Sequence, residues 1–165
     1  MLPLFRFALA LSILAAWPAH VEACSCHSVS EFASQAKDSP LLIAGQVVAT
    51  VTSTEGPSST RPDNVAALEI DVLDVTRGRE TRRRIRVWDQ FVNSSCSLEL
   101  HRLKPGTYVL IAVNSKEERL TELAELIGIK PAPDDYVWGT CRDPWRPFKT
   151  VADMRRFIED GLRLR

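Results

Sequence analysis

Four cysteines behind an apolar leader constrain this chain more than any other feature of its sequence. The leader, residues 1–23, has one arginine, Arg6, then an apolar run from Phe7 to Trp17, and ends in the small-residue pattern Val21-Glu22-Ala23. This arrangement is typical of a secretory signal peptide. The apolar run is about half of the ~20 residues that a transmembrane helix needs, so we expect no membrane span. We therefore expect cleavage after Ala23 and a secreted or periplasmic protein.

Cleavage after Ala23 would make Cys24 the first residue of the mature chain. Its free α-amine and its carbonyl oxygen would lie beside each other, and that pair could ligate a metal in a partner's active site. A bacterial lipoprotein signal is the alternative, because Val21, Ala23 and Cys24 fit its pattern although Glu22 does not. Lipidation would consume the Cys24 thiol and leave an odd number of cysteines, which is unusual in an oxidising compartment.

The cysteines Cys24, Cys26, Cys96 and Cys141 predict two disulfides in an exported chain of this size. A Cys24–Cys26 bond would close a very small, strained ring, so we set that pairing aside. Both remaining pairings tie the N-terminus to Cys96 and Cys141. Each bond closes a long loop, which is worth about 4 kcal/mol in the chain-entropy model. The N-terminus should therefore be fixed to the body of the domain.

Residues 24–165 have a suitable length for one domain with a sizeable core. The full chain has 21 basic and 21 acidic residues, so its charge gives no reason to expect a nucleic acid or an anionic membrane as partner. We expect a monomer. The basic cluster of Arg82, Arg83, Arg84 and Arg86 is interpreted as a solvated strand face rather than a binding patch.

Alternating and continuous apolar runs predict about five strands after the leader. The first spans 41–51, where Gly45 indicates a bulge or sharp bend. Further strands are expected around Leu68–Val72 and Ile85–Val87, at 107–113 and at 135–140. Arg77-Gly78 and Pro105-Gly106 are turn signals. An apolar stripe predicts a C-terminal helix through Val151, Met154, Phe157, Ile158 and Leu162, with Thr150 as N-cap and Asp153 in its first turn.

Two further helices are expected, at 117–127 and at 29–36. Five short strands with bulges and peripheral helices, in a mainly β domain, favour a small closed barrel of the oligonucleotide/oligosaccharide-binding (OB) type. A β-sandwich is the alternative, although it usually has about seven strands.

Four segments of the chain resemble the tissue inhibitors of metalloproteinases and the wider netrin-like modules. These segments are Cys24-Ser25-Cys26, the strand with residues 43–48, Ser94-Ser95-Cys96 and Trp138-Gly139-Thr140-Cys141. The resemblance covers most of residues 24–141 and includes the order of the strands and of the cysteines. It implies an OB-like barrel with disulfides Cys24–Cys96 and Cys26–Cys141.

The resemblance also implies a mode of action. In the inhibitory members, the amine and carbonyl of the first residue chelate the zinc of a metalloendopeptidase, and the second side chain enters the specificity pocket. These roles would fall on Cys24 and Ser25, with Asn93, Ser94 and Ser95 beside them on the contact ridge. This chain departs from the animal inhibitors, because it has four cysteines instead of twelve and lacks their C-terminal subdomain. A non-inhibitory netrin-like interaction module of the envelope or extracellular space is therefore the alternative.

Other chemistry finds little support in the sequence. It contains no Gly-x-Ser-x-Gly, His-Glu-x-x-His or phosphate-binding glycine loop, so we expect neither an enzyme nor a cofactor. Cys24, Cys26 and His27 are too crowded for a tetrahedral metal cage. The Cys-x-Cys pair leaves a thiol redox protein as a third hypothesis. The pair Asp134-Asp135 is interpreted as an exposed turn.

Aromatic and basic residues alternate near the C-terminus. Trp138, Trp145 and Phe148 interleave with Arg142 and Arg146. This pattern resembles a stacking surface for single strands or sugars on an OB barrel. Packing of the final helix against the barrel is the favoured interpretation.

Overall fold

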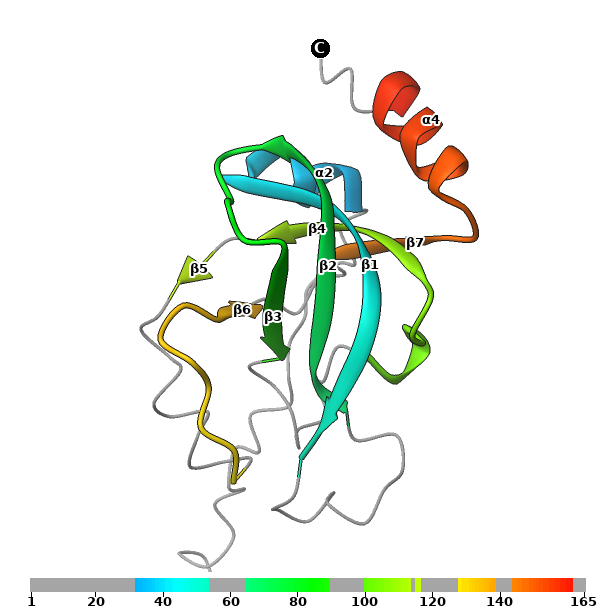
Figure 1. Ribbon diagram of the computed structural model, residues 1–165. Helices are drawn as coiled ribbons and strands as arrows, with labels where there is room; N and C mark the ends of the chain where they lie inside the picture. Colours follow the sequence, from blue (N-terminus) through cyan, green and yellow to red (C-terminus); the bar gives the residue numbers. More distant parts are fainter. Residues whose placement is uncertain are drawn as a thin grey trace, which may run out of the picture.

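The described part of the chain is mainly β, with seven strands in one curled sheet of half-barrel shape (Figure 1). The computed structural model describes residues 32–53, 65–89, 100–113, 115–116, 128–138 and 144–161. The strand order is β5-β6-β3-β2-β1-β4-β7. The strands are β1 Leu41–Thr52, β2 Val65–Arg77, β3 Arg84–Asp89, β4 Tyr108–Val113, β5 Ser115–Lys116, β6 Tyr136–Trp138 and β7 Trp145–Phe148. The helices are α2 Phe32–Asp38, the short 3-10 helix η2 Leu100–Arg102 and α4 Val151–Gly161.

The long strands β1 and β2 form the antiparallel centre of the sheet, and both bend strongly along their length (Figure 1). The predicted irregularity at Gly45 is confirmed, because the pairing of β1 with β2 shifts register between Ala44 and Gly45. A Cβ atom on Gly45 would lie 2.4 Å from Ile70 Cγ2 and 2.7 Å from the Asp71 carbonyl oxygen. Only glycine permits this close approach of the two strands.

The sequence predicted five strands, whereas the described part of the chain has seven. The additional strands are β5 and β7. The strand β5 has two residues and follows β4 after a single intervening position, so its short sequence has no period of its own. The strand β7 contains Pro147, which cannot donate to a ladder, and it lies at the edge of the sheet beside β4. Neither strand has the alternating pattern on which the prediction relied.

The strands β3 and β6 are parallel neighbours, with Val87 opposite Tyr136 and Asp89 opposite Trp138. On the other side of β6, the short strand β5 pairs antiparallel with it. On its outer edge, β4 pairs with β7, and on its inner edge it pairs with β1. The chain from β4 to β5 therefore pairs first with β1 and then with β6.

The main core lies on one face of the curled sheet and receives side chains from five of its strands and from the 100–103 segment. Its buried members are Leu41, Ile43, Val47, Val65, Leu68, Ile70, Ile85, Val87, Leu100, Leu103, Val109, Ile111, Val113, Tyr136 and Trp138. Alternate residues of β1 and β4 point to the opposite face, where α2 and α4 cover them in a second cluster. A third, smaller cluster surrounds Trp88.

Both described α-helices begin and end close to their predicted positions. In α4, the backbone N–H of Asp153 donates to Thr150 Oγ1 at 3.1 Å, which confirms the predicted N-cap. The helix α2 spans 32–38 instead of the predicted 29–36, and Arg77 Nη1 lies 2.5 Å from the Ala36 carbonyl oxygen and 2.8 Å from that of Lys37. This contact satisfies carbonyl groups at the C-terminal end of α2. The predicted helix at 117–127 lies outside the described residues.

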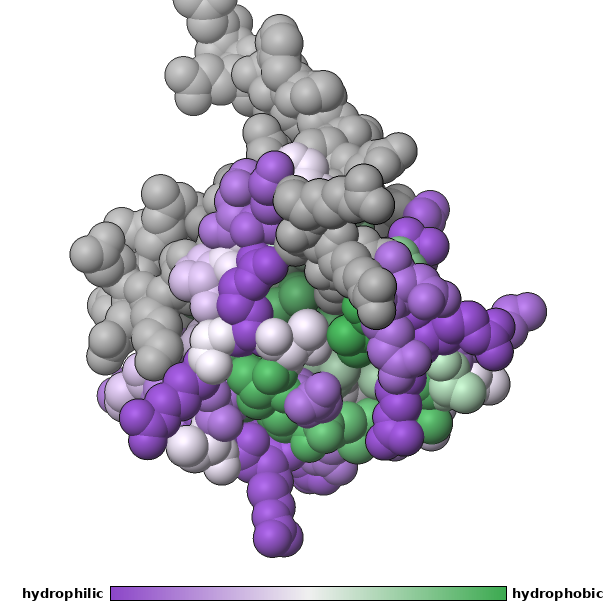
Figure 2. All heavy atoms as spheres, turned by 90° about the horizontal axis from the view of Figure 1, so that it is seen from above, coloured by the Kyte–Doolittle hydropathy of each residue, from purple (hydrophilic) through white to green (hydrophobic). Residues whose placement is uncertain are grey.

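Seen from above, apolar side chains gather in a patch surrounded by hydrophilic ones (Figure 2). Among the residues that the structure describes, no helix is long and apolar enough to cross a bilayer.

Candidate functional site

The residues predicted to form the inhibitory site lie outside the described part of the chain. They are Cys24, Ser25, Cys26, Asn93, Ser94, Ser95, Cys96 and Cys141. The disulfide pairing and the zinc-binding role of Cys24 therefore remain predictions. His27 and the leader also fall outside the described ranges, whereas His101 lies in η2.

The described strands do fix where two of the cysteine-containing segments leave the sheet. Cys96 follows β3, which ends at Asp89, and Cys141 follows β6, which ends at Trp138. Since β3 and β6 run parallel with Asp89 opposite Trp138, both segments start from the same end of one strand pair. The end of β1 and the start of β2 lie at this end too, because Thr52 pairs with Val65 and Ala67 with Trp88. We call this part of the sheet the cysteine end.

Side chains at the cysteine end are buried in the domain. Trp138 is 1% exposed, and its Nε1–H donates to the Ala112 carbonyl oxygen at 3.1 Å. Asp89 is completely buried. Trp138 therefore belongs to the main core and is not part of a stacking surface.

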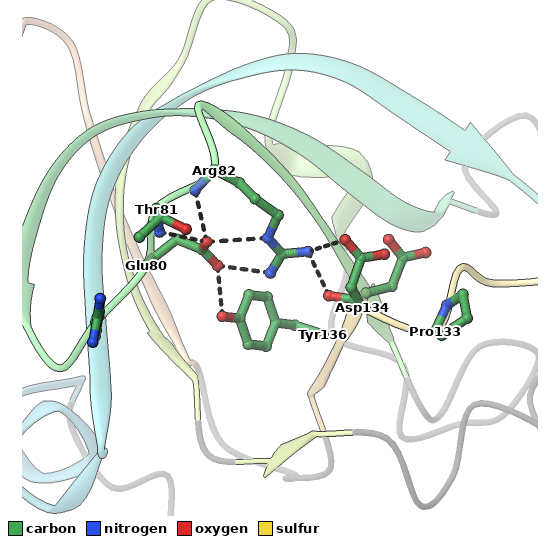
Figure 3. A pocket seen from close by; sticks show the side chains of 8 residues that line it. Glu80, Thr81, Arg82, Pro133, Asp134 and Tyr136 are labelled. Carbon is green, nitrogen blue, oxygen red and sulfur yellow. Dashed lines mark hydrogen bonds and ion pairs between the residues drawn. The ribbon is translucent and has the colours of Figure 1, made fainter.

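The other end of the β3–β6 pair is built around Glu80, whose side chain is 5% exposed. Its Oε1 atom accepts hydrogen bonds from the backbone N–H groups of Thr81 and Arg82, both at 2.8 Å, and from Arg82 Nε at 3.0 Å. Its Oε2 atom accepts from Arg82 Nη2 and from the Tyr136 hydroxyl, both at 2.6 Å (Figure 3). Glu80 thus joins the turn between β2 and β3 to the first residue of β6. We call this part of the sheet the charged end.

Arg82 has a second partner on its opposite edge. Its Nη1 atom donates to the Asp134 carbonyl oxygen at 2.5 Å and to Asp134 Oδ2 at 2.9 Å. The guanidinium also lies over the Tyr136 ring, 5.0 Å from the centroid. A pocket of about 550 Å³ opens beside these groups, lined by Arg79, Glu80, Thr81, Arg82, Pro133, Asp134, Asp135 and Tyr136 (Figure 3).

Hydrogen bonding keeps the Glu80 carboxylate ionised in spite of its burial. Burial by itself would raise the pKa of Glu80, but bonds from the Arg82 side chain, the Tyr136 hydroxyl and two backbone N–H groups outweigh it and lower the pKa to about 2. The bond to Glu80 raises the pKa of Arg82. Burial, together with the bond to Glu80, raises the pKa of Tyr136. At neutral pH this end of the sheet holds a charged pair with a neutral phenol.

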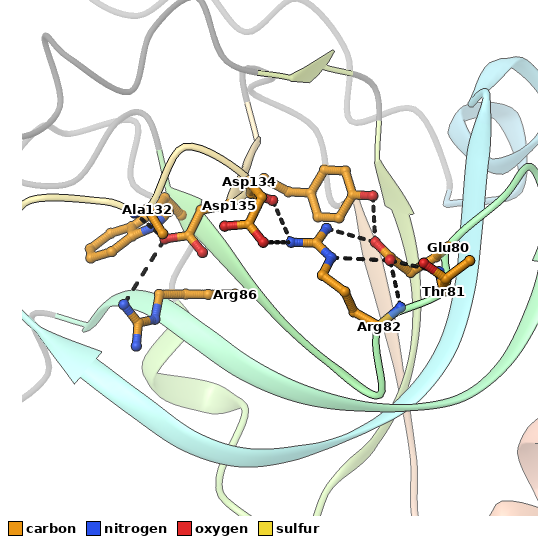
Figure 4. Close-up of polar contacts among 9 residues, drawn as sticks. Glu80, Thr81, Arg82, Arg86, Ala132, Asp134 and Asp135 are labelled. Carbon is orange, nitrogen blue, oxygen red and sulfur yellow. Dashed lines mark hydrogen bonds and ion pairs between the residues drawn. The ribbon is translucent and has the colours of Figure 1, made fainter.

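Asp135 corrects the prediction of an exposed Asp134-Asp135 turn. The Asp134 side chain is exposed, but Asp135 is 6% exposed. Its Oδ2 atom accepts from Trp88 Nε1 at 2.7 Å and from the Ala132 backbone N–H at 2.9 Å, with Arg86 Nη1 at 4.0 Å (Figure 4). Burial and these donors make Asp135 a structural carboxylate that closes the 132–135 turn over β3.

Three arginines of the basic cluster have carboxylate partners, but only Arg84 and Arg86 lie on β3 itself, as the prediction of a strand face requires. Arg84 pairs with Asp71 at 2.6 Å, and Arg86 pairs with Glu69 at 2.5 Å, both across the β2–β3 ladder. Arg82 pairs with Glu80 and Asp134. Since Arg84 and Arg86 each have a negative neighbour, the β2–β3 face carries mixed charges rather than a continuous basic surface.

Among the C-terminal aromatic residues, Phe148 packs the last helix against the sheet, as the favoured interpretation predicted, whereas Trp138 and Trp145 pack in the main core. The Phe148 and Phe157 rings lie 5.5 Å apart between centroids, and the Arg146 guanidinium lies 4.2 Å from the Phe157 centroid. Met154 of α4 is 1% exposed in the same cluster. These contacts dock α4 against β7 and β4.

No pattern in the sequence joins Glu80, Arg82 and Tyr136 into one cluster. Glu80 and Tyr136 are 56 positions apart, and only the pairing of β3 with β6 brings them together. A carboxylate two positions before an arginine run was a visible signal for the Glu80–Arg82 pair alone.

No group of three or more His, Cys, Asp or Glu side chains among the described residues is arranged to hold a metal ion. In comparisons with known proteins, no family model matches the chain and no curated protein matches it.

Proposed function

We propose that this chain is an exported, disulfide-bonded binding protein that inhibits a zinc metalloendopeptidase through its mature N-terminus at Cys24. One observation carries the proposal. The segments that contain Cys96 and Cys141 start from the same end of the parallel β3–β6 pair, with Asp89 opposite Trp138. Two disulfides from Cys24 and Cys26 to these segments would therefore hold the N-terminus at the cysteine end of the sheet, where it can be presented to a partner.

The strand pairing supports an OB-like closed barrel as part of this proposal. The strands β4 and β5 are separated by one position, and they pair with β1 and β6 respectively. If they act as one bent strand, the circuit β1-β2-β3-β6-β5/β4 closes back on β1 with five strands, while β7 lies outside it. The hydrogen bond from Trp138 to the Ala112 carbonyl oxygen ties β6 to β4 across the closing seam.

The chemistry follows from what a catalytic zinc needs. Such a zinc keeps an open position for water and accepts a fifth ligand. The amine nitrogen and carbonyl oxygen of Cys24 would displace that water, and Ser25 would enter the specificity pocket. Cys26 lies shortly before α2, whose C-terminal end is held by Arg77. A terminus held by disulfides and followed by an anchored helix loses little conformational entropy on binding.

The position of the first residue tests this proposal. A protein that retains Ala23 converts the Cys24 amine into an amide, which is a poor zinc ligand, and adds a residue where the metal would lie. We expect the mature form to inhibit zinc metalloendopeptidases from a panel and the Ala23-extended form to lose inhibition. Inhibition constants for both forms are the measurement, and intact mass with N-terminal sequencing establishes the terminus of each.

A Ser25→Ala variant with the native terminus is the matched control, because it retains both proposed zinc ligands and should change selectivity among proteases more than it abolishes inhibition. Equal inhibition by the extended and mature forms would exclude Cys24 as the zinc ligand. No inhibition by a verified mature form would favour the non-inhibitory netrin-like module.

A further inference from the structure

We propose that the pocket at the charged end binds a carboxylate side chain of an acidic peptide segment, with Arg82 as its anchor. In the free protein, Asp134 occupies the edge of Arg82 that the incoming carboxylate would take. This site lies at the opposite end of the β3–β6 pair from the cysteine end. It does not depend on the proposed inhibitory function.

Arg82 is oriented before any ligand arrives. Two parallel contacts join it to Glu80, Nε to Oε1 at 3.0 Å and Nη2 to Oε2 at 2.6 Å. The Tyr136 ring lies against its face, and the Tyr136 hydroxyl holds Glu80 from the other side (Figure 3). A guanidinium fixed in this way directs its Nη1 edge to one place and loses little freedom when an anion binds there.

Asp134 shows what that edge of Arg82 binds, and it can leave easily. Its carboxylate already accepts from Nη1, yet its side chain is 67% exposed. Exposed ion pairs contribute little to stability because water solvates both partners. A second carboxylate can therefore replace Asp134 at small cost while Asp134 turns into solvent.

The charges around the pocket favour a single negative charge on the ligand. Exchange of one carboxylate for another leaves the balance beside Glu80 and Asp135 unchanged, whereas a dianionic phosphate would add repulsion from both. Arg79 lines the same pocket, is exposed, and makes no hydrogen bond or ion pair with the described part of the chain. It supplies a second cation for a neighbouring acidic residue of the ligand.

The size of the pocket indicates more than a lone carboxylate group. Its volume of about 550 Å³ is within the range of pockets that enclose small ligands. Pro133 and Thr81 line it beside the charged groups and leave room for a side chain with its flanking backbone. An acidic peptide segment fits this combination of one anchored cation, a second cation that is unpaired among the described residues, and open space.

The test measures binding of a fluorescein-labelled hexaglutamate peptide to the full mature protein by fluorescence anisotropy at low, fixed ionic strength. We expect Asp134→Asn to raise the affinity about two- to fivefold, because it weakens the internal competitor. Arg79→Gln should lower the affinity by a similar factor. Both side chains are exposed, so neither variant should disturb the fold.

Arg83→Gln is the matched control, since Arg83 is an exposed cation of the same turn that does not line the pocket. Three results would overturn the proposal: no binding of the peptide, no gain or a loss of affinity in Asp134→Asn, or equal losses in Arg83→Gln and Arg79→Gln. N-acetylglutamate amide is the second probe. If its inhibition constant, expressed per glutamate residue, equals that of the peptide, the assignment of a peptide segment is wrong.

Discussion

The cysteine end and the charged end of the β3–β6 pair show two ways to hold the same two strands. At the charged end, Glu80 joins the β2–β3 turn to Tyr136 of β6 through hydrogen bonds and an ion pair with Arg82. At the cysteine end, the strands lead into segments that contain Cys96 and Cys141, for which the sequence predicts covalent bonds to the N-terminus. The first arrangement depends on the ionised state of Glu80, and the predicted disulfides of the second would depend on oxidation. The two ends should therefore fail under different conditions.

The largest effect is expected from loss of a disulfide at the cysteine end. Cys96→Ser should lower the free energy of unfolding by about 2–5 kcal/mol, because it removes the predicted Cys24–Cys96 bond and loosens the N-terminus, which only Cys26–Cys141 would still hold. Denaturant unfolding of the exported protein without reductant is the measurement. Ser95→Ala, in the same segment, is the control and should change little.

The pairing itself can be checked on the unmodified protein. Non-reducing peptide mapping should give Cys24–Cys96 and Cys26–Cys141. A Cys24–Cys141 or Cys24–Cys26 peptide would contradict the predicted pairing, and unchanged stability in Cys96→Ser would contradict a structural bond at that position.

The next effect concerns acid sensitivity at the charged end. The pKa of Glu80 is about 2 in the folded protein against an ordinary value of 4.5, so its stabilisation is complete above about pH 4.5 and is lost as the pH falls toward 2. The full loss amounts to about 3 kcal/mol. Glu80→Gln should be less stable at neutral pH and should show a flatter decline between these two values.

Glu159→Gln provides the comparison for Glu80→Gln, because Glu159 is an exposed residue of α4. The free energy of unfolding of Glu159→Gln should equal that of the unmodified protein at every pH. If Glu80→Gln also follows the unmodified protein, the Glu80 network does not hold the charged end.

A smaller effect is expected from the hydrogen bond between Trp88 and Asp135, in the third core cluster. Trp88→Phe removes the Nε1–H that donates to buried Asp135 and leaves Ala132 N–H as the close donor to that carboxylate. Loss of a hydrogen bond to a buried charged group should lower the free energy of unfolding by about 1–3 kcal/mol. Thermal and denaturant unfolding measure the change.

Trp145→Phe is the matched control for Trp88→Phe. The buried Trp145 Nε1 atom has no hydrogen-bond partner among the described residues, so this substitution removes no bond that they make. It should destabilise the protein less than Trp88→Phe does. Equal losses in the two variants would show that ring volume, rather than the bond to Asp135, determines the effect.

Period-2 patterns in the sequence were sufficient to predict β2 and β3. Leu68, Ile70 and Val87 alternate with charged residues, and the structure places all three in the main core. Gly45 was recognisable because glycine inside a β-branched run indicates a bulge. These features depend on neighbours in sequence, and local physics is enough to infer them.

Features that depend on strand register could not be inferred from patterns in the sequence. Burial of Asp135 requires the turn at 132–135 to fold over Trp88, 47 positions away, and adjacent acidic residues resemble an exposed turn until that contact is known. The strand β7 contains Pro147, so its pattern argues against a strand although an edge position permits one. The predicted inhibitory residues show the reverse situation, because the sequence pattern identifies them and the described residues do not include them.

The smallest effect should come from the exposed ion pair one step along β3 from the charged end. Arg84 and Asp71 lie 2.6 Å apart, but their side chains are 57% and 39% exposed. The hydrogen bond from Arg84 lowers the pKa of Asp71, yet solvent screens most of the resulting interaction. Arg84→Gln should therefore leave the unfolding midpoint nearly unchanged, and any residual difference should disappear at high salt.

Arg82→Gln makes the same chemical change two positions earlier and should be clearly destabilising, because it leaves the buried Glu80 carboxylate without its main partner. If the two substitutions were equally harmless, burial would not distinguish the Glu80–Arg82 pair from the solvated face of β2 and β3. The difference between the ion pairs would then be one of geometry alone.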